Sequence, residues 1–259
     1  MSEDLREDSF ISHLLELRTR LLRAIVAIGV IFLCLMPWSG AIYDLLASPL
    51  IATLPSGTRM IATGVVTPFI VPIKITLLVA FVLALPFVLY QAWAFVAPGL
   101  YAHERRLALP LVAGSTLLFL AGMAFCYFFV FRVVFSFIAQ FAPKSVVPAP
   151  DIEEYLSFVT TMFIAFGMTF EVPVAVILLA KAEIVSVAKL REIRPYVIVA
   201  AFIVAAIVTP PDVASQIMLA VPICLLYEAG ILIANAISRP EAEAKNEPTM
   251  PAGPEDSQG

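Results

Sequence analysis

Six apolar runs, separated by short polar segments, account for most of the chain. A run needs about twenty apolar residues to cross a bilayer as a helix, and four of the six are long enough. Helices are required because lipid offers no hydrogen-bond partner to free backbone N–H and C=O groups. The pattern predicts an all-α integral membrane protein with six transmembrane helices, at residues 21–38, 69–90, 107–131, 156–180, 196–208 and 213–237.

The last two runs are expected to form short helices. The fifth run has about a dozen residues, and the segment TPPD, residues 209–212, turns the chain directly into the sixth. Two short helices joined in this way can cross only where the bilayer is thin or where other helices shield their ends. A thin spanning pair is favoured over a re-entrant hairpin, and both arrangements stay open.

The segments outside the runs complete the predicted organisation. Residues 1–20 are charged and amphipathic, and no small-residue cleavage site follows the first run. That run is therefore expected to be a permanent span rather than a signal peptide. Residues 40–67 are expected to form a short amphipathic helix against the outer membrane surface. Residues 21–237 form the predicted membrane domain, and the acidic, proline-rich residues 238–259 are predicted to be a disordered cytoplasmic tail.

The composition supports a membrane location and argues against several functions. Hydrophobic residues make up 61% of the 259 positions, against about half in a soluble domain, so lipid must cover much of the apolar surface. The formal net charge of -4 offers no basic footprint for nucleic acid. The three cysteines lie inside apolar runs, where thiols usually pack rather than bind metal. No cofactor or metal is expected.

Enzyme signatures are also missing. The segment HERRL lacks the second histidine of a zinc-binding HExxH helix, because Leu107 stands in its place. The sequence contains no GxSxG nucleophile elbow and no phosphate-binding loop. We therefore expect a protein that is not an enzyme.

Lysine and arginine residues predict the orientation, since they concentrate on the cytoplasmic side of membrane proteins. With six crossings, twelve of the sixteen basic residues share one side. These are Arg6, Arg18, Arg20, Arg23, Arg105, Arg106, Lys181, Lys189, Arg191, Arg194, Arg239 and Lys245. The other side holds Arg59 and Lys144, with Lys74 and Arg132 near helix ends, where side chains can snorkel. Both termini are therefore predicted to be cytoplasmic.

Two glutamates lie among arginines at the predicted cytoplasmic boundary. Glu16 belongs to HLLELRTRLLR before the first run, and Glu104 belongs to FVAPGLYAHERR before the third. Each has a structural explanation: an i,i+4 pair with Arg20 for Glu16, and the helix dipole for Glu104. Together they form a natural acceptor for guanidinium groups, whose forked donors match a carboxylate. A ligand that is cationic at one end is therefore expected.

Polar residues within the later runs have both structural and functional interpretations. Glu171 lies near the middle of the fourth run, two residues before Pro173. It is either a neutral acid bonded to a neighbouring helix, or it lines a cavity for a ligand, a partner helix or a proton. Thr209, Asp212 and Gln216 surround the turn between the last two runs. They either shape and cap that turn or grip another transmembrane helix.

Several stretches together resemble a known family. HLLELRTRLL, FVAPGLYAHERR, SFVTTMFIAFGMTFEVPV and RPYVIVAAFIVAAIVTPPDVASQ match, in order and spacing, the receptor subunit of the twin-arginine translocase, the TatC family. The resemblance covers residues 12–235. It implies a glove-like protein of six helices in the bacterial inner membrane, with both termini cytoplasmic. Such proteins bind signal peptides with paired arginines on folded cargo, recruit single-span TatA- and TatB-type subunits, and draw on the proton gradient.

The resemblance also implies roles for individual residues. The matching positions are Glu16, Arg18, Phe95, Leu100 and Glu104 for the signal-peptide site, Glu171 for a membrane cavity, and Pro49, Thr209, Asp212 and Gln216 for the outer face and partner subunits. One departure concerns Thr67, because many relatives carry an acid at this position. It casts doubt on an outer-face acid there, and not on signal-peptide binding.

Two other functions stay open. One is a proton-coupled secondary transporter with Glu171 as proton carrier. Such transporters usually show internal repeats and broken helices near the midplane, and neither is evident in the sequence. The other is an assembly scaffold in which Glu171 is only structural. Self-association of the chain is also left open.

Overall fold

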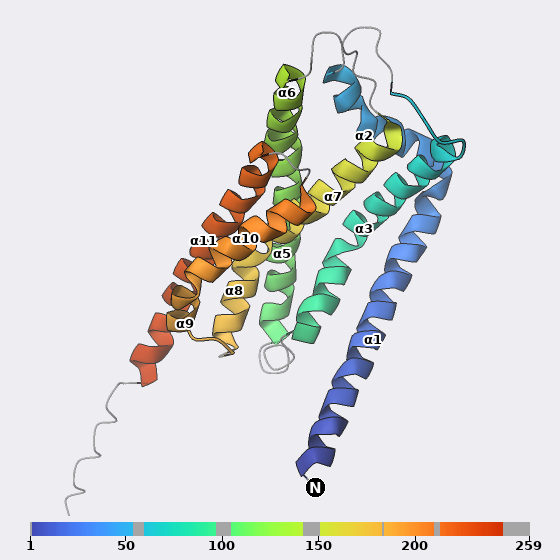
Figure 1. Cartoon of the computed structure of the whole chain (residues 1–259). Helices are drawn as coiled ribbons and strands as arrows, with labels where there is room; N and C mark the ends of the chain where they lie inside the picture. The colour runs from blue at the N-terminus through green and yellow to red at the C-terminus, as the bar shows by residue number, and fades with distance from the viewer. Residues whose placement is uncertain are drawn as a thin grey trace, which may run out of the picture.

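The chain is almost entirely helical in the residues that the computed structural model describes, namely 2–53, 60–96, 105–141, 151–182, 184–209 and 213–245 (Figure 1). The longest helices are α1 (Ser2–Leu35), α3 (Thr67–Val96), α5 (Arg105–Phe125), α7 (Ile152–Phe170) and α11 (Val213–Lys245). The shorter ones are α2 (Ser39–Thr53), α6 (Phe131–Phe141), α8 (Val172–Lys181), α9 (Val187–Glu192) and α10 (Arg194–Val208). A 3₁₀ turn, η1 (Met36–Trp38), joins α1 to α2, and a π-helical turn, η2 (Cys126–Val130), joins α5 to α6.

Five stretches of the described chain are long and apolar enough to cross a membrane. They are Ile11–Ala47, Thr67–Phe95, Leu109–Ser136, Ile152–Lys181 and Ser215–Ile237. Helix α10 has only 15 residues, so the prediction of a short fifth helix is confirmed. The prediction of a short sixth helix is wrong, because α11 has 33 residues. The two prolines after Thr209 end α10, but they lie before α11 and therefore do not limit its length.

Two helices, α1 and α11, extend further than the sequence analysis expected. Helix α1 includes residues 2–20, which were assigned to a separate N-terminal segment. Helix α2, from Ser39 to Thr53, covers the first part of the segment 40–67 that was expected to contain a short helix. Helix α11 includes residues 238–245, which were assigned to a disordered tail, whereas residues 246–259 lie outside the described residues.

The fourth apolar run is a broken helix, although the sequence analysis found no such break. Helix α7 ends at Phe170, α8 begins at Val172, and Glu171 forms the turn between them. Pro173 explains the break, because proline has no backbone N–H and its ring clashes with the carbonyl four residues earlier. The break leaves the Glu171 side chain at a helix junction rather than on a continuous helical face.

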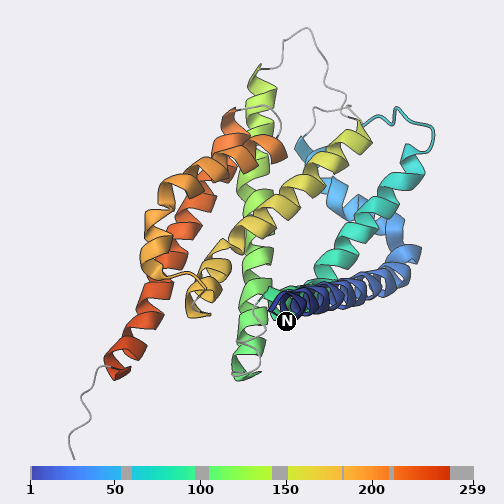
Figure 2. The same ribbon diagram turned by 60° about the horizontal axis from the view of Figure 1, so that its bottom comes forward.

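The helices are arranged around a central rod made of α5, η2 and α6. Figures 1 and 2 both show α1, α2 and α3 on one side of this rod, and α8, α10 and α11 on the other. Helix α7 crosses the rod obliquely. Helix α1 is the outermost helix on its side and packs against α3.

Two glycines allow α5 and α7 to approach closely. A Cβ atom added to Gly122 on α5 would overlap the backbone carbonyl of Phe166, and one added to Gly167 on α7 would overlap the ring of Phe119. Phe119 and Phe166 are themselves buried, so neither could move aside into free space. The crossing therefore depends on residues without a side chain at these two positions.

Helices α8, α9, α10 and α11 are held together by an apolar cluster and two polar contacts. Val176, Leu190, Tyr227 and Ile231 form a buried cluster between α8, α9 and α11. The Tyr227 hydroxyl donates to the Leu190 carbonyl oxygen over 2.8 Å. Arg194 Nη2 on α10 donates to Oε2 of Glu228 on α11 over 2.6 Å. Glu228 is thus part of a helix-to-helix ion pair.

A polar clasp, defined by Thr63, Lys74, Asp151 and Glu153, joins the start of α7 to the start of α3. Asp151 accepts from the backbone N–H and the hydroxyl of Thr63 over 3.0 and 2.7 Å, and it also caps α7. Lys74 on α3 donates to Glu153 over 2.7 Å. The bonds from Thr63 lower the pKa of the Asp151 carboxyl to about 2. This clasp ties the α1–α3 side of the molecule to α7.

Candidate functional site

Helix α1 is held against the C-terminal end of α3 by two side-chain contacts. The rings of His13 and Phe95 stack with their centroids 4.3 Å apart and an interplanar angle of 16°. Two turns further along α1, Arg20 Nη1 donates to Oε1 of Gln91 over 3.5 Å. Gln91 belongs to α3 and is buried. These contacts fix how α1 is turned relative to α3 at this end.

Glu16 lies between these two contacts on α1, and its carboxylate already holds a guanidinium. Arg20 donates to Oε1 of Glu16 from Nε over 2.8 Å and from Nη2 over 2.6 Å. This confirms the i,i+4 pair expected from the sequence. Both donors use one oxygen, whereas an ionised carboxylate offers about four acceptor positions. The Glu16 side chain is 36% exposed, so the remaining acceptor capacity is open to a ligand.

We call the group of His13, Glu16, Arg20, Gln91 and Phe95 the α1–α3 corner. Of the predicted binding residues, it contains Glu16 and Phe95. Leu100 and Glu104 lie outside the described residues, in the segment between α3 and α5. Their position relative to Glu16 therefore stays a prediction.

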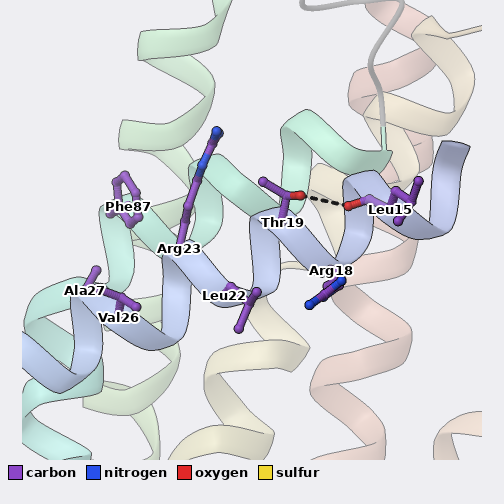
Figure 3. Close-up of a pocket in the computed structure, with 8 residues that line it drawn as sticks. All are labelled: Leu15, Arg18, Thr19, Leu22, Arg23, Val26, Ala27 and Phe87. Atoms are coloured by element: carbon purple, nitrogen blue, oxygen red, sulfur yellow. Dashed lines mark hydrogen bonds between the residues drawn. The ribbon is translucent and has the colours of Figure 1, made fainter.

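Arg18 is turned away from Glu16. Residues two apart on a helix lie on nearly opposite sides, and Arg18 lines a hollow on the exposed side of α1 (Figure 3). The structure therefore places Arg18 and Glu16 on different sides of α1, and the role of Arg18 in signal-peptide binding stays a prediction.

Sequence reasoning did not identify His13 and Gln91 as part of this corner. Gln91 has a recognisable signal, because it is the strongly polar residue in the apolar stretch FVLYQAWAF. The contact of His13 with Phe95 has no such signal, since it depends on how α1 and α3 are aligned.

Glu171 is buried at the break between α7 and α8, with 7% of its surface exposed. Among the described residues, neither carboxylate oxygen has a hydrogen-bond partner. The hydroxyl of Ser115 lies near this carboxyl, and it accepts from Trp93 Nε1 over 2.9 Å. A buried carboxyl without a partner is costly in a membrane. Glu171 is thus able to accept a hydrogen bond from another molecule.

Comparison with known proteins identifies the family. The model of the family "Sec-independent protein translocase protein (TatC)" matches residues 12–222. The chain is 52% identical over 242 residues to the TatC protein of Azotobacter chroococcum, covering 93% of this chain and 95% of that one. It is 54% identical over 221 residues to TatC of Escherichia coli K12, covering 85% and 86%. The chain belongs to the TatC family.

The fold agrees with this assignment. A crystal structure of a twin-arginine translocase receptor, TatC, superposes with a TM-score of 0.77 at 36% identity, covering 88% of this chain and 100% of that one. The chain is therefore a membrane subunit of the twin-arginine translocase that acts as a signal-peptide receptor, and it is not an enzyme. The prediction of the family and of this function is confirmed.

The residues that the TatC resemblance assigned to the outer face have mostly internal contacts where they are described. Thr209 is buried, and its hydroxyl donates to the Ala205 carbonyl oxygen over 2.8 Å at the end of α10. Gln216 on α11 reaches the Phe202 carbonyl oxygen over 3.3 Å. These bonds match the structural interpretation of the turn, and the partner-binding role stays a prediction. The Pro49 side chain and Asp212 lie outside the described residues.

Proposed function

We propose that this TatC-family subunit binds the paired arginines of a signal peptide between Glu16 and Glu104. The observation that carries the proposal is the guanidinium of Arg20 on Glu16, because it demonstrates a carboxylate in this corner that accepts a forked donor. A second guanidinium can use the oxygen that Arg20 leaves unused. Phe95, and by sequence Leu100, supply apolar contact beside it, while Arg18 lies next to this site on the outer side of α1.

The two α1–α3 contacts support this role physically. Each well-formed hydrogen bond to a charged group contributes roughly 1.5–3 kcal/mol to binding. The full contribution requires that the receptor group is already held in its binding position. The His13–Phe95 stack and the Arg20–Gln91 bond hold Glu16 at the end of α3 before any ligand arrives. Binding then costs less ordering of the receptor.

We further propose that the chain crosses the bacterial inner membrane six times with both termini in the cytoplasm. The placement of the twelve basic residues supports this orientation. The α1–α3 corner would then face the cytoplasm, where unexported proteins present their signal peptides. The apolar part of the peptide would insert beyond the corner toward Glu171, whose unpartnered carboxyl accepts a donor.

Single-span TatA- and TatB-type subunits are the proposed partners of the α10–α11 region. Tyr196 and Ile207 are among the apolar residues of α10 that are largely exposed, with 74% and 78% of their surfaces free. Thr209, Asp212, Gln216 and Pro49 are proposed to mark the outer end of this partner surface. Glu171 serves in the proposal as a hydrogen-bond acceptor for peptide or partner, rather than as a transporter's proton carrier.

Charge reversal tests the binding site. Glu16→Lys and Glu104→Lys should each weaken binding of an Arg-Arg signal peptide by about tenfold or more, because each removes a charged hydrogen bond and adds repulsion. Fluorescence anisotropy with a labelled peptide and purified full-length protein measures the change. Glu192→Lys, an exposed acid on α9, is the matched control and should leave the affinity unchanged. Unchanged affinity in Glu104→Lys would show that the site assignment is wrong.

A further inference from the structure

Three polar side chains from separate segments meet between α3, α5 and the break in the fourth apolar run. Trp93 belongs to α3, Ser115 belongs to α5, and Glu171 forms the turn between α7 and α8. Ser115 is completely buried, and Glu171 exposes only 7% of its surface. Because bulk water does not reach these two side chains, their polar atoms depend on partners within the protein or on a bound molecule.

The register of α5 against α7 places Ser115 opposite Glu171. The two helices cross with opposite chain directions (Figure 1), and at the crossing the Phe119 ring lies against Gly167. Ser115 lies one turn before Phe119 on α5, and Glu171 lies one turn after Gly167. Residues four apart share one face of a helix, so the close crossing brings the Ser115 hydroxyl near the Glu171 carboxyl.

The indole of Trp93 holds the oxygen of Ser115 from the other side. Its Nε1 donates to Ser115 Oγ over 2.9 Å. The indole itself is partly buried and packs against the apolar cluster of Leu85, Leu89 and Phe119. A tryptophan N–H can only donate, whereas a serine hydroxyl has one proton and two acceptor positions. The bond from Trp93 therefore uses the Ser115 oxygen as acceptor and leaves its proton available.

Glu171 is the acceptor that lies near this proton. Neither of its carboxylate oxygens has a hydrogen-bond partner among the described residues, and a buried acceptor without a donor is destabilising. Rotation of the Ser115 hydroxyl turns its proton toward the carboxyl. The alternative is a bond to the carbonyl oxygen four residues earlier on the same helix. The neighbouring Thr116 makes such a bond, to Val112 over 2.8 Å.

We propose that Trp93 and Ser115 are positioning residues for Glu171. Trp93 holds the oxygen of Ser115, and Ser115 donates its proton to the Glu171 carboxyl, which keeps that carboxyl turned toward α5 while no ligand is bound. A donor on an inserted peptide or partner helix then replaces Ser115. This replacement rests on the proposed function of Glu171 as an acceptor, whereas the bond from Ser115 forms without any ligand.

Infrared difference spectroscopy tests the bond in the purified full-length protein without peptide or partner. Subtracting the spectrum of Glu171→Gln identifies the carboxyl band of Glu171, and each variant is compared with its own Glu171→Gln form. Ser115→Ala should shift this band, because the carboxyl loses its donor. Ser115→Cys should give a smaller shift in the same direction, since a thiol is a weak donor. Trp93→Phe should broaden the band, because the Ser115 hydroxyl is no longer held.

The neighbouring hydroxyl on α5 provides a matched control. Thr116→Val removes a hydroxyl whose bond goes to the Val112 carbonyl oxygen, so it should leave the Glu171 band unchanged. An unchanged band in Ser115→Ala would overturn the proposal. An equal shift in Thr116→Val would also overturn it, because the band would then report a general change in α5.

An export assay separates this result from the proposed role of Glu171. Glu171→Leu removes the acceptor and should reduce export of a substrate with a twin-arginine signal peptide. If Ser115→Ala shifts the band but Glu171→Leu exports normally, the bond from Ser115 is confirmed and the acceptor role of Glu171 toward a ligand is wrong. If export is lost in Glu171→Leu but the band does not respond to Ser115→Ala, Trp93 and Ser115 are not its positioning residues.

Discussion

Among the apolar stretches, the one that begins with α1 and the one formed by α7 and α8 differ most in the share of their residues that is buried inside the protein. In the most apolar window of Ile152–Lys181, 56% of the residues are buried inside the protein, against 0% in Ile11–Ala47. The α7 side chains Met162 and Phe166 are fully buried in the main apolar cluster. Helix α1 instead packs along α3 on one side only, and a ring stack and a hydrogen bond join the two helices at the α1–α3 corner.

This difference distinguishes the helices that form the rigid frame of the protein from the helix that presents residues for binding. A tightly packed crossing tolerates little change in side-chain volume, so α5, α7 and α11 suit a rigid frame. A peripheral helix keeps its polar groups accessible, so α1 can present Glu16 on one side and Arg18 on another. The proposed ligand of this receptor is therefore expected at α1, and the determinants of stability at α7.

A Gly→Leu substitution made in each of the two regions should give the largest difference in the stability of the protein. Gly167→Leu places a side chain where the Phe119 ring already lies, and overpacking of this kind should cost about 3 kcal/mol or more. Gly29→Leu on α1 meets no neighbouring atom within 4 Å of the added Cβ and should change stability by less than about 0.5 kcal/mol. Thermal unfolding in detergent, followed by size-exclusion chromatography, measures both. Similar losses in the two variants would contradict the contrast between the regions.

Loss of the ring stack should affect α1 alone. His13→Ala removes the contact with Phe95, and such aromatic pairs contribute about 0.5–1.5 kcal/mol. Amide hydrogen exchange should therefore accelerate severalfold in the first half of α1 and stay unchanged in α7. Leu14→Ala removes an exposed apolar side chain from the same helix and serves as the control. Faster exchange throughout α7 in His13→Ala would indicate that the two regions unfold together.

The smallest effect is expected at the polar clasp that connects the two regions. The pKa of Asp151 is lowered to about 2 in the folded protein from 3.8, so its ionised form stabilises the fold. This stabilisation is fully present above about pH 4 and is lost as the pH falls through about 2. Asp151→Asn should lower the melting temperature modestly at neutral pH, and the gap to wild type should narrow in acid. Glu154→Gln is the control, because it removes a charge from the same turn without touching Thr63. If this variant lowered the melting temperature by the same amount and with the same pH dependence, the stabilising role assigned to Asp151 would be wrong.

The sequence predicted the helical class because runs of apolar residues report directly on lipid contact. It predicted the Glu16–Arg20 pair because residues four apart on a helix are neighbours. It did not predict the length of α11, since the Pro-Pro turn was interpreted as a limit on both flanking helices. It also missed the break at Glu171, although Pro173 was visible two residues later.

The parts of the site that could not be predicted depend on contacts between helices. The stack of His13 on Phe95 and the bond from Arg20 to Gln91 require a particular alignment of α1 with α3, which no local pattern encodes. The separation of Arg18 from Glu16 is the opposite case, because helical spacing alone places them on different sides. The shared role that the TatC resemblance implies for the two residues stays a prediction.

Photo-crosslinking at the α1–α3 corner tests the central claim, that Glu16 and Glu104 bind one arginine pair together. A photoreactive amino acid is introduced at each position in turn in the full-length protein, and a labelled signal peptide is added with either Arg-Arg or Lys-Lys. The account predicts that both positions capture the Arg-Arg peptide and that capture of the Lys-Lys peptide is much weaker, because lysine lacks the forked donors. Equal capture of the two peptides, or capture from one position only, would contradict it.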